Sequence, residues 1–281
     1  MYDKIEKIGD STIQHGKTNN RIYLQKLSKS DYPEIVDRLD KLAAVKTYTK
    51  ISAKVPGWAV KRFQQEGYIS EAYVPKFYNG KEDGFFVSNF IDHTRSILDI
   101  HQREEIDHNI QMAVDKKNEP LTVKYNPEFS FRILGKKDVP ALVNVYKEVF
   151  KTYPFPIFNE EYIAKTMDEN IVYFGAFDKN KLIAASSAEM DIKAQNVEMT
   201  DFATLPGYRG HGLAVILLKE MEAEMRKRKI YTFYTIARAY SPAMNITFAK
   251  MQYNYSGTMI NNTNISGRIE SMNVWYKFAL H

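Results

Sequence analysis

The 281-residue sequence contains no cysteine. This absence excludes disulfides, thiolate metal sites and a cysteine nucleophile. The chain also has no run of about 18 apolar residues and, at its N-terminus, no apolar stretch or cleavage site of a secretory signal. No low-complexity tract occurs, and prolines number only ten. We therefore expect a soluble, cytoplasmic, globular protein that does not enter a membrane.

The sequence also lacks a strong excess of charge of one sign. Its 39 Lys and Arg residues face 34 Asp and Glu residues, which leaves a net charge of +5. The longest basic run, residues 226–229, falls at the end of a predicted helix, where cations complement the helix dipole. The alternative is a patch for an acidic partner or an adenosine 3′-phosphate. Because no face or long run concentrates the positive charge, we expect no nucleic-acid partner.

Histidines are few and poorly placed for a metal. His93, His101 and His108 are seven or eight residues apart, and no acidic triad accompanies them. We expect no metal site.

Length and turn signals predict two domains. Residues 115–120 are polar and end at Pro120, and residues 125–128 add a second turn signal. We place an N-terminal domain at 1–120 and a C-terminal domain at 128–281.

Hydrophobic periodicity predicts an α+β fold in which helices alternate with strands, three of which form an antiparallel meander. In the N-terminal domain the predicted order is helix 30–42, strand 48–55, helix 59–65 and strand 68–74. In the C-terminal domain it is strand 129–134, a helix capped by Asp138, a helix after Asn159, strands 171–177, 182–191 and 197–205, helix 212–228, strand 231–238, helix 243–251 and one or two final strands.

The two domains echo each other. Tyr48, Phe63 and Tyr68 are spaced much like Tyr231, Phe248 and Tyr253, and each stretch predicts strand, helix, strand. Chance could produce one such match. A duplication would make the N-terminal domain a degenerate copy of the second half of the other, without a glycine loop and so without a bound cofactor.

A glycine loop between a strand and a long helix carries the main functional signal. Arg209, Gly212 and Ala214 satisfy the pattern Arg-x-x-Gly-x-Ala. Unpaired N–H groups and the positive dipole end at a helix start bind pyrophosphate, and glycines let it approach the backbone. The alternative is a tight turn without a ligand. The patterns Gly-x-Gly-x-x-Gly and Gly-Lys-Ser/Thr of other nucleotide folds are absent.

Residues 205–214 resemble motif A of the GNAT acetyltransferase superfamily. The resemblance implies the GNAT fold, an α+β fold with three layers around a mostly antiparallel mixed sheet, preceded here by a smaller α/β domain. It also implies acetyl-CoA as cosubstrate and N-acetyl transfer as the reaction. It implies that a splayed strand binds the pantetheine arm through Phe202, Ala203 and Thr204. The pyrophosphate-binding residues would be Arg209, Gly210, His211, Gly212, Leu213 and Ala214.

Five further segments resemble the β-lysine N6-acetyltransferase family. They are residues 11–16, 53–56, 75–83, 153–156 and 198–204. The resemblance implies that the partner is a small amine, (S)-β-lysine, and that the product is the compatible solute Nε-acetyl-β-lysine of osmoadaptation. One alternative is an enzyme that acetylates another small amine, such as lysine or a polyamine. The other is a non-catalytic module that binds acyl-CoA. A homodimer is possible.

Acetyl transfer to an amine needs a base, and Glu198 is our first candidate, with Asp201 second. Strand alternation puts these two carboxylates on different faces unless a bulge intervenes. Either carboxylate could instead be merely solvated. Glu189 and Asp191 are candidates for holding a substrate ammonium.

The remaining site predictions come from position. Ser241 and Asn245 lie at the start of a predicted helix, and we expect them to bind the amides of the cofactor. The alternative for Ser241 is a role as helix cap. Phe248 stands where the family usually has a general-acid tyrosine, for which Tyr240, Tyr253 or Tyr255 could substitute. For the substrate we predict that Arg238 binds the carboxylate. We also predict that the loop of residues 153–156 walls the substrate site through Tyr153 and Phe155, with packing on the hydrophobic core as the alternative.

Overall fold

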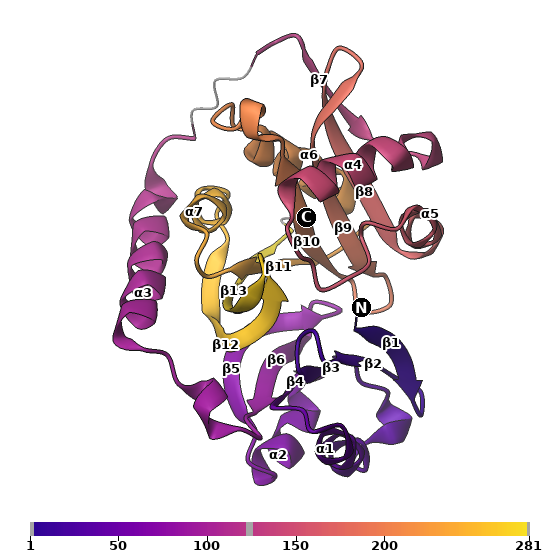
Figure 1. Ribbon diagram of the computed structural model, residues 1–281, viewed down its shortest axis with the longest axis vertical. Helices are drawn as coiled ribbons and strands as arrows, with labels where there is room; N and C mark the ends of the chain where they lie inside the picture. Colours follow the sequence, from indigo (N-terminus) through magenta and orange to yellow (C-terminus); the bar gives the residue numbers. More distant parts are fainter. Residues whose placement is uncertain (1–2, 122–125, 280–281) are drawn as a thin grey trace.

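One continuous sheet runs through the protein. The computed structural model describes residues 3–121 and 126–279, and its thirteen strands lie in the order β1-β2-β3-β4-β6-β5-β12-β13-β11-β10-β9-β8-β7. The N-terminal half lies below and the C-terminal half above in Figure 1. The two halves meet where β5 pairs with β12.

The strands are β1 Lys4–Ile8, β2 Ser11–Gly16, β3 Arg21–Lys26, β4 Lys50–Pro56, β5 Ile69–Tyr78, β6 Glu82–Asn89, β7 Phe129–Ile133, β8 Ile171–Asp178, β9 Lys181–Asp191, β10 Asn196–Thr204, β11 Thr232–Arg238, β12 Asn254–Ile265 and β13 Arg268–Phe278. The α-helices are α1 Ile35–Lys46, α2 Gly57–Gln65, α3 Ile100–Asp115, α4 Val139–Val149, α5 Glu160–Glu169, α6 Leu213–Lys227 and α7 Pro242–Lys250. None of the helices in the described ranges is long and apolar enough to cross a membrane.

The C-terminal half confirms the predicted order of helices and strands. Strands β7 to β10 form an antiparallel meander, and β10 then pairs in parallel with β11. Asn159 starts α5 as predicted, because its Oδ1 accepts from the Tyr162 N–H at 2.9 Å. Asp138 is a correction: its carboxylate accepts from the Gly135 N–H and from Arg132 and so stabilises the turn before α4 rather than the helix itself.

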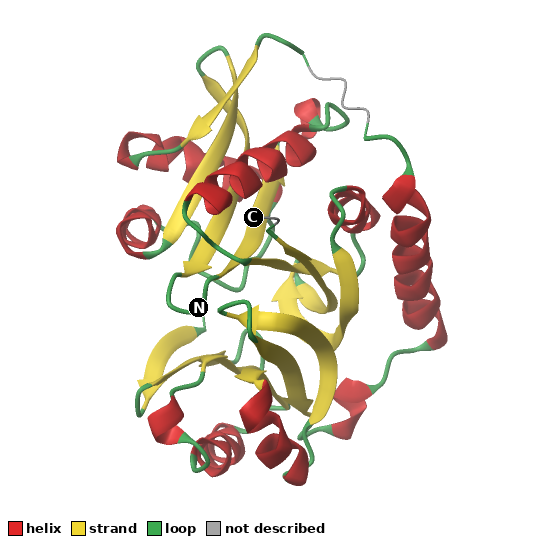
Figure 2. Ribbon diagram, turned by 180° about the vertical axis from the view of Figure 1, so that it is seen from behind, coloured by secondary structure: helices red, strands yellow, loops and turns green. Residues whose placement is uncertain are grey.

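The N-terminal half contains the predicted α1, β4, α2 and β5, but α1 begins only at Ile35 because Ser30 lies in a separate 3₁₀ turn. Strands β1, β2, β3 and β6 and helix α3 were not predicted. Strand β2 buries Ser11, Gln14 and His15, which hides the apolar alternation of a half-buried strand. Helix α3 runs along the outside of the molecule beside α7 (Figures 1 and 2), and it is mostly polar.

The two halves share a local topology. The sheet orders β3-β4-β6-β5 and β10-β11-β13-β12 are equivalent, and each begins with a parallel pair. Phe63 and Tyr68 pack edge to face with ring centroids 5.1 Å apart, and Phe248 and Tyr253 do the same at 5.1 Å. This repetition supports the predicted duplication.

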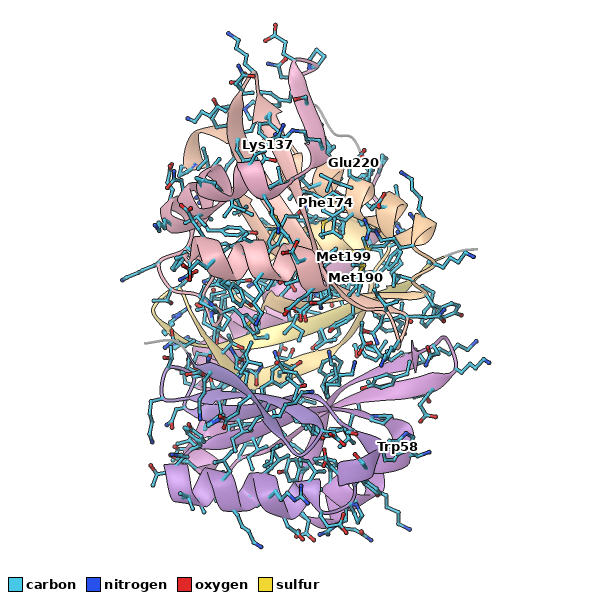
Figure 3. All side chains as sticks on the ribbon, turned by 90° about the vertical axis from the view of Figure 1, so that its right-hand side faces the viewer. Trp58, Lys137, Phe174, Met190, Met199 and Glu220 are labelled. Atoms are coloured by element: carbon cyan, nitrogen blue, oxygen red, sulfur yellow. The ribbon has the colours of Figure 1, made fainter. Side chains whose placement is uncertain are left out.

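The hydrophobic core crosses the junction between the halves. Ala72, Val74 and Phe86 of the N-terminal half belong to the same buried cluster as Met259 and Val274 of the C-terminal half. Side chains from both halves fill the space between their ribbons (Figure 3). The division at 1–120 and 128–281 remains a proposal, and part of the predicted boundary lies outside the described residues.

Close backbone contact at Gly257 joins the two halves. A Cβ there would lie 2.1 Å from the Glu71 carbonyl oxygen and 2.9 Å from the Ala72 Cα. We predict that Gly257→Ala lowers the free energy of unfolding by about 1–3 kcal/mol, as overpacking does. Urea denaturation measures the effect. The control is Gly135→Ala, where a Cβ would meet nothing within 4 Å; equal stability of the two variants would contradict the prediction.

Candidate active site

A cavity of about 460 Å³ lies between the two halves. The C-terminal half contributes β9, β10, β11, the start of α7 and the loop after α4 to its wall. The N-terminal half contributes Arg21 and Tyr23 of β3 and Lys54 of β4. Gln14 of β2 also holds the loop after α4, because its Nε2 donates to the Pro154 carbonyl at 2.8 Å. Both halves therefore build the cavity.

Strands β10 and β11 part at this cavity. Their parallel pairing covers only Asn196 to Glu198, although β11 continues to Arg238. Beyond Glu198, strand β10 remains paired to β9, where Ala203 faces Ala185 and Thr204 faces Ala184. The splayed strand that the resemblance implied is therefore present. Phe202 lines the cavity, and Ala203 is buried.

A bulge turns Asp201 toward the cavity on the same side as Glu198. The register between β9 and β10 shifts between Thr200 and Ala203, and Asp201 has a positive φ of 55°. In a regular strand the two carboxylates would point to opposite faces, so a bulge is the condition under which both face the cavity. The Asp201 carboxylate accepts hydrogen bonds from the Tyr153 and Ser187 hydroxyls. Asp201 thus holds the loop of Tyr153, which makes it the weaker candidate for a base.

Glu198 and Glu189 face each other across strands β10 and β9. Directly opposed residues of an antiparallel pair share a face, so the two carboxylates lie side by side in the cavity. Burial and the neighbouring Glu189 carboxylate raise the pKa of Glu198 to about 8. Burial likewise raises the pKa of Glu189. A raised pKa near neutrality suits a group that accepts and returns a proton.

Lys54 and Tyr234 complete this cluster, and the site predictions from sequence missed both. The Lys54 ammonium donates to the Tyr234 hydroxyl at 2.8 Å and lies over the same ring, 5.1 Å from its centroid. Its positive charge favours the ionised form of Glu198, and burial lowers the pKa of Lys54. The segment 53–56, which resembles the β-lysine N6-acetyltransferase family, was the signal that could have identified Lys54.

The glycine loop has the backbone of an anion site. Gly210 and Gly212 have φ values of 84° and 69°, which other residues rarely adopt, and α6 begins at Leu213 directly after Gly212. The first N–H groups of α6, including those of Leu213 and Ala214, have no partner within the helix. Arg209, Gly210 and His211 are exposed, so a ligand can reach the loop, whereas the Leu213 side chain packs in the core.

At the start of α7, the structure separates Ser241 from Asn245. Ser241 lines the cavity, and within the described residues its side chain makes no capping hydrogen bond. The hydroxyl is therefore available to a ligand.

Asn245 corrects a prediction. Its Nδ2 donates to the Arg238 and Ser241 carbonyls, while its Oδ1 accepts from Asn273 and from the Trp275 indole at 2.8 Å. The side chain holds α7 against β13 rather than pointing to a cofactor.

Phe248 lines the cavity and packs edge to face on Phe202, with ring centroids 5.6 Å apart. The tyrosines suggested as substitutes for a general acid do not reach the cavity in the described structure. Tyr253 is fully buried behind Phe248, Tyr255 is partly exposed and bonds Thr258, and Tyr240 lies outside the cavity wall.

Arg238 lines the cavity but is already paired. Its Nε and Nη2 donate to the two oxygens of the buried Glu270 carboxylate at 2.8 and 2.9 Å. The same carboxylate also accepts from the Arg268 Nε at 3.0 Å, so one negative charge serves two guanidiniums, and Arg238 as the carboxylate clamp stays a prediction. Asp191 is likewise paired, with Lys26. Tyr153 and Phe155 both line the cavity, as predicted for its wall.

Comparisons with known proteins agree with this geometry. Residues 139–248 match the model of the acetyltransferase (GNAT) family. A β-lysine N(6)-acetyltransferase of Methanococcus maripaludis is 43% identical over 99% of both chains, and one of Methanosarcina mazei is 30% identical over 87% of this chain and 96% of its own. The N-acetyltransferase YodP of Bacillus subtilis is 35% identical over 75% of each chain.

The carboxylate pair predicts a measurable coupling. Glu189→Gln removes the negative charge beside Glu198, so the ionised form of Glu198 becomes easier to reach and its pKa falls below about 8. Carbon-13 NMR of glutamate side-chain carboxyls, titrated by pH, measures this pKa, and the resonance missing in Glu198→Gln assigns it. The control Glu161→Gln alters an exposed glutamate on α5 and should leave it unchanged. An unmoved pKa in Glu189→Gln would show that the two carboxylates are not coupled.

Proposed function

This chain belongs to the β-lysine N6-acetyltransferase family of GNAT acetyltransferases, and from this premise we propose that it transfers the acetyl group of acetyl-CoA to the ε-amine of (S)-β-lysine. The observation that carries the chemistry is the Glu198 carboxylate at the point where β10 and β11 part. Acetylation removes one positive charge from the substrate. The product is a zwitterion without net charge, which suits a role as a compatible solute.

The residues of the cosubstrate site fit acetyl-CoA. The turn at Gly210 and Gly212 exposes backbone N–H groups at a helix start, and residues 209–214 would hold the pyrophosphate. The unpaired edge of β10 near residues 202–204 would bind the pantetheine arm, with Ser241 opposite it on α7. When bound, acetyl-CoA supplies a thioester carbonyl open to attack by an amine.

The amine must first lose a proton. With a pKa of about 10.4 in water, an ε-amine is the free base in only about one molecule in a few thousand at pH 7. Glu189 and Glu198 hold the ammonium between two carboxylates, and Glu198 accepts its proton. The neutral nitrogen then attacks the thioester carbon, and the carbon–sulfur bond breaks to release the CoA thiolate. As the amide forms, the nitrogen loses its second proton to water.

The leaving thiolate departs without a tyrosine on α7, because that position is Phe248. A simple thiol has a pKa of about 8.5, so the thiolate is a tolerable leaving group near neutral pH. Phe248 and Phe202 instead give this part of the cavity wall two apolar rings in edge-to-face contact. Release of CoA in the presence of an amine separates this enzyme from a non-catalytic acyl-CoA-binding module, which would bind without turnover.

We predict that Glu198→Gln lowers kcat by about 10²–10⁴-fold, the usual contribution of a general base. The acetyl-CoA KM should stay nearly constant, because Glu198 lies beside the acceptor. In the wild type, kcat/KM for β-lysine should rise with pH through about 8, where Glu198 ionises, and this limb should vanish in the variant. Steady-state thiol release across the pH range measures both. Full activity of the variant would transfer the role of base to Asp201 or a water chain.

For the loop, we predict that Gly212→Asp raises the acetyl-CoA KM at least about tenfold above that of Gly212→Ala. Both variants place a Cβ at a φ of 69°, but only the aspartate sets a carboxylate against the pyrophosphate. The comparison therefore isolates charge from backbone strain. Equal KM values in the two folded variants would remove residues 209–214 from the phosphate site.

A further inference from the structure

Arg21 is a buried arginine without a carboxylate partner. It is 3% exposed and begins β3, where Arg21, Tyr23 and Gln25 alternate along one face and line the cavity. Its Nη1 donates to the Asn262 carbonyl at 2.7 Å and to the Thr263 hydroxyl at 3.2 Å. Within residues 3–121 and 126–279, its Nε has no hydrogen-bond partner and its guanidinium forms no ion pair.

This arrangement is costly for the protein alone. A buried donor without an acceptor costs about 1–3 kcal/mol, and more when the donor is charged. Burial lowers the pKa of Arg21 to about 10, and the negative charges of Asp3 and Glu71 offset that only in part. Buried polar groups are nearly always satisfied, so an orphan donor at a cavity wall indicates that a ligand completes its hydrogen bonds.

The other charged donors of the cavity wall differ from Arg21. Arg238 is bidentate with Glu270, which it shares with Arg268, and Lys26 pairs with Asp191. Lys193 also lines the cavity, but it is an exposed side chain. Lys54 donates to Tyr234 and faces Glu198. An incoming anion would therefore find free guanidinium donors at Arg21.

The cavity consequently has two poles of opposite charge. Glu189 and Glu198 form the negative pole on the C-terminal half, and Arg21 forms the positive pole on the N-terminal half. Tyr23 lies between them: the Arg21 guanidinium sits 5.1 Å from its ring centroid, and both carboxylates act on its hydroxyl electrostatically. The complementary ligand has an ammonium at one end and a carboxylate at the other.

Resting on the proposed acetyl transfer, we infer that the N-terminal half supplies the carboxylate-binding subsite of the acceptor, with Arg21 as its anion-binding residue. The amine to be acetylated lies at Glu198, and the substrate carboxylate receives the free N–H groups of the guanidinium. The N-terminal half thereby selects amino acids over diamines such as cadaverine, which place no carboxylate in the cavity.

Binding of unreacted substrate tests this inference. Calorimetry in the presence of CoA compares β-lysine with its carboxamide, which keeps the amines and shape but removes the negative charge. In the wild type the carboxamide should bind at least about 30-fold more weakly, as for loss of one partner of a buried charge pair. In Arg21→Met the acid and the amide should bind alike.

Arg62→Met is the matched control, because Arg62 lies on α2, pairs with Asp37 and Glu66 and does not line the cavity. It should keep the wild-type preference for the acid. Arg21→Gln retains a donor for the Asn262 carbonyl and replaces Arg21→Met if that variant does not fold. A wild type that binds acid and amide alike, or an Arg21 variant that keeps the preference, would overturn the inference.

Failure of the acceptor proposal gives a different result. If the wild type acetylates another amino acid and not β-lysine, the acceptor is wrong, and the same acid–amide comparison with that amino acid still decides the role of Arg21. If the best acceptor has no carboxylate, the inference on Arg21 is also wrong.

Discussion

Three cations of the N-terminal half, two of them buried and Arg95 half-buried, hold the irregular middle of β12, and the rest of the site depends on this contact. Lys50 donates to the carbonyl of Ile260, Arg95 to that of Asn261 and Arg21 to that of Asn262. Strand β12 loses its regular pairing with β13 between Met259 and Thr263, which leaves these carbonyls in need of donors. Buried carbonyls must be satisfied, so neither half is complete without the other.

The same contact supports the single sheet that runs through both halves. Lys50 is neutralised by Glu71, whose other oxygen accepts from the Ile260 N–H at 2.6 Å. The backbone contact at Gly257 and the shared core then bring β3 and β4 opposite β9 and β10. The cavity forms in the remaining space, with basic residues from one half facing acidic residues of the other.

The local chemistry of the C-terminal half was readable from sequence because its signals are local. A helix start after glycines and a strand before it depend on neighbours along the chain, and the structure has both. The bulge at Asp201 was anticipated only as a condition, since no sequence pattern distinguishes it from regular strand. Asn245 was misjudged because its partner Trp275 comes from β13 across the sheet.

The sequence by itself determined the glycine loop, the order of elements after residue 129 and Glu198 as the leading carboxylate, because each follows from periodicity, backbone freedom or strand position. Only the tertiary structure decided that Glu189 raises the pKa of Glu198 and that Lys54 and Tyr234 join these carboxylates. It also decided that Arg21 lines the same cavity with its Nε lacking a hydrogen-bond partner among the described residues. These residues lie far apart in the chain. Their charges and hydrogen bonds acquire meaning only when the sheet brings them within a few ångströms of one another, because burial weakens the screening that water provides.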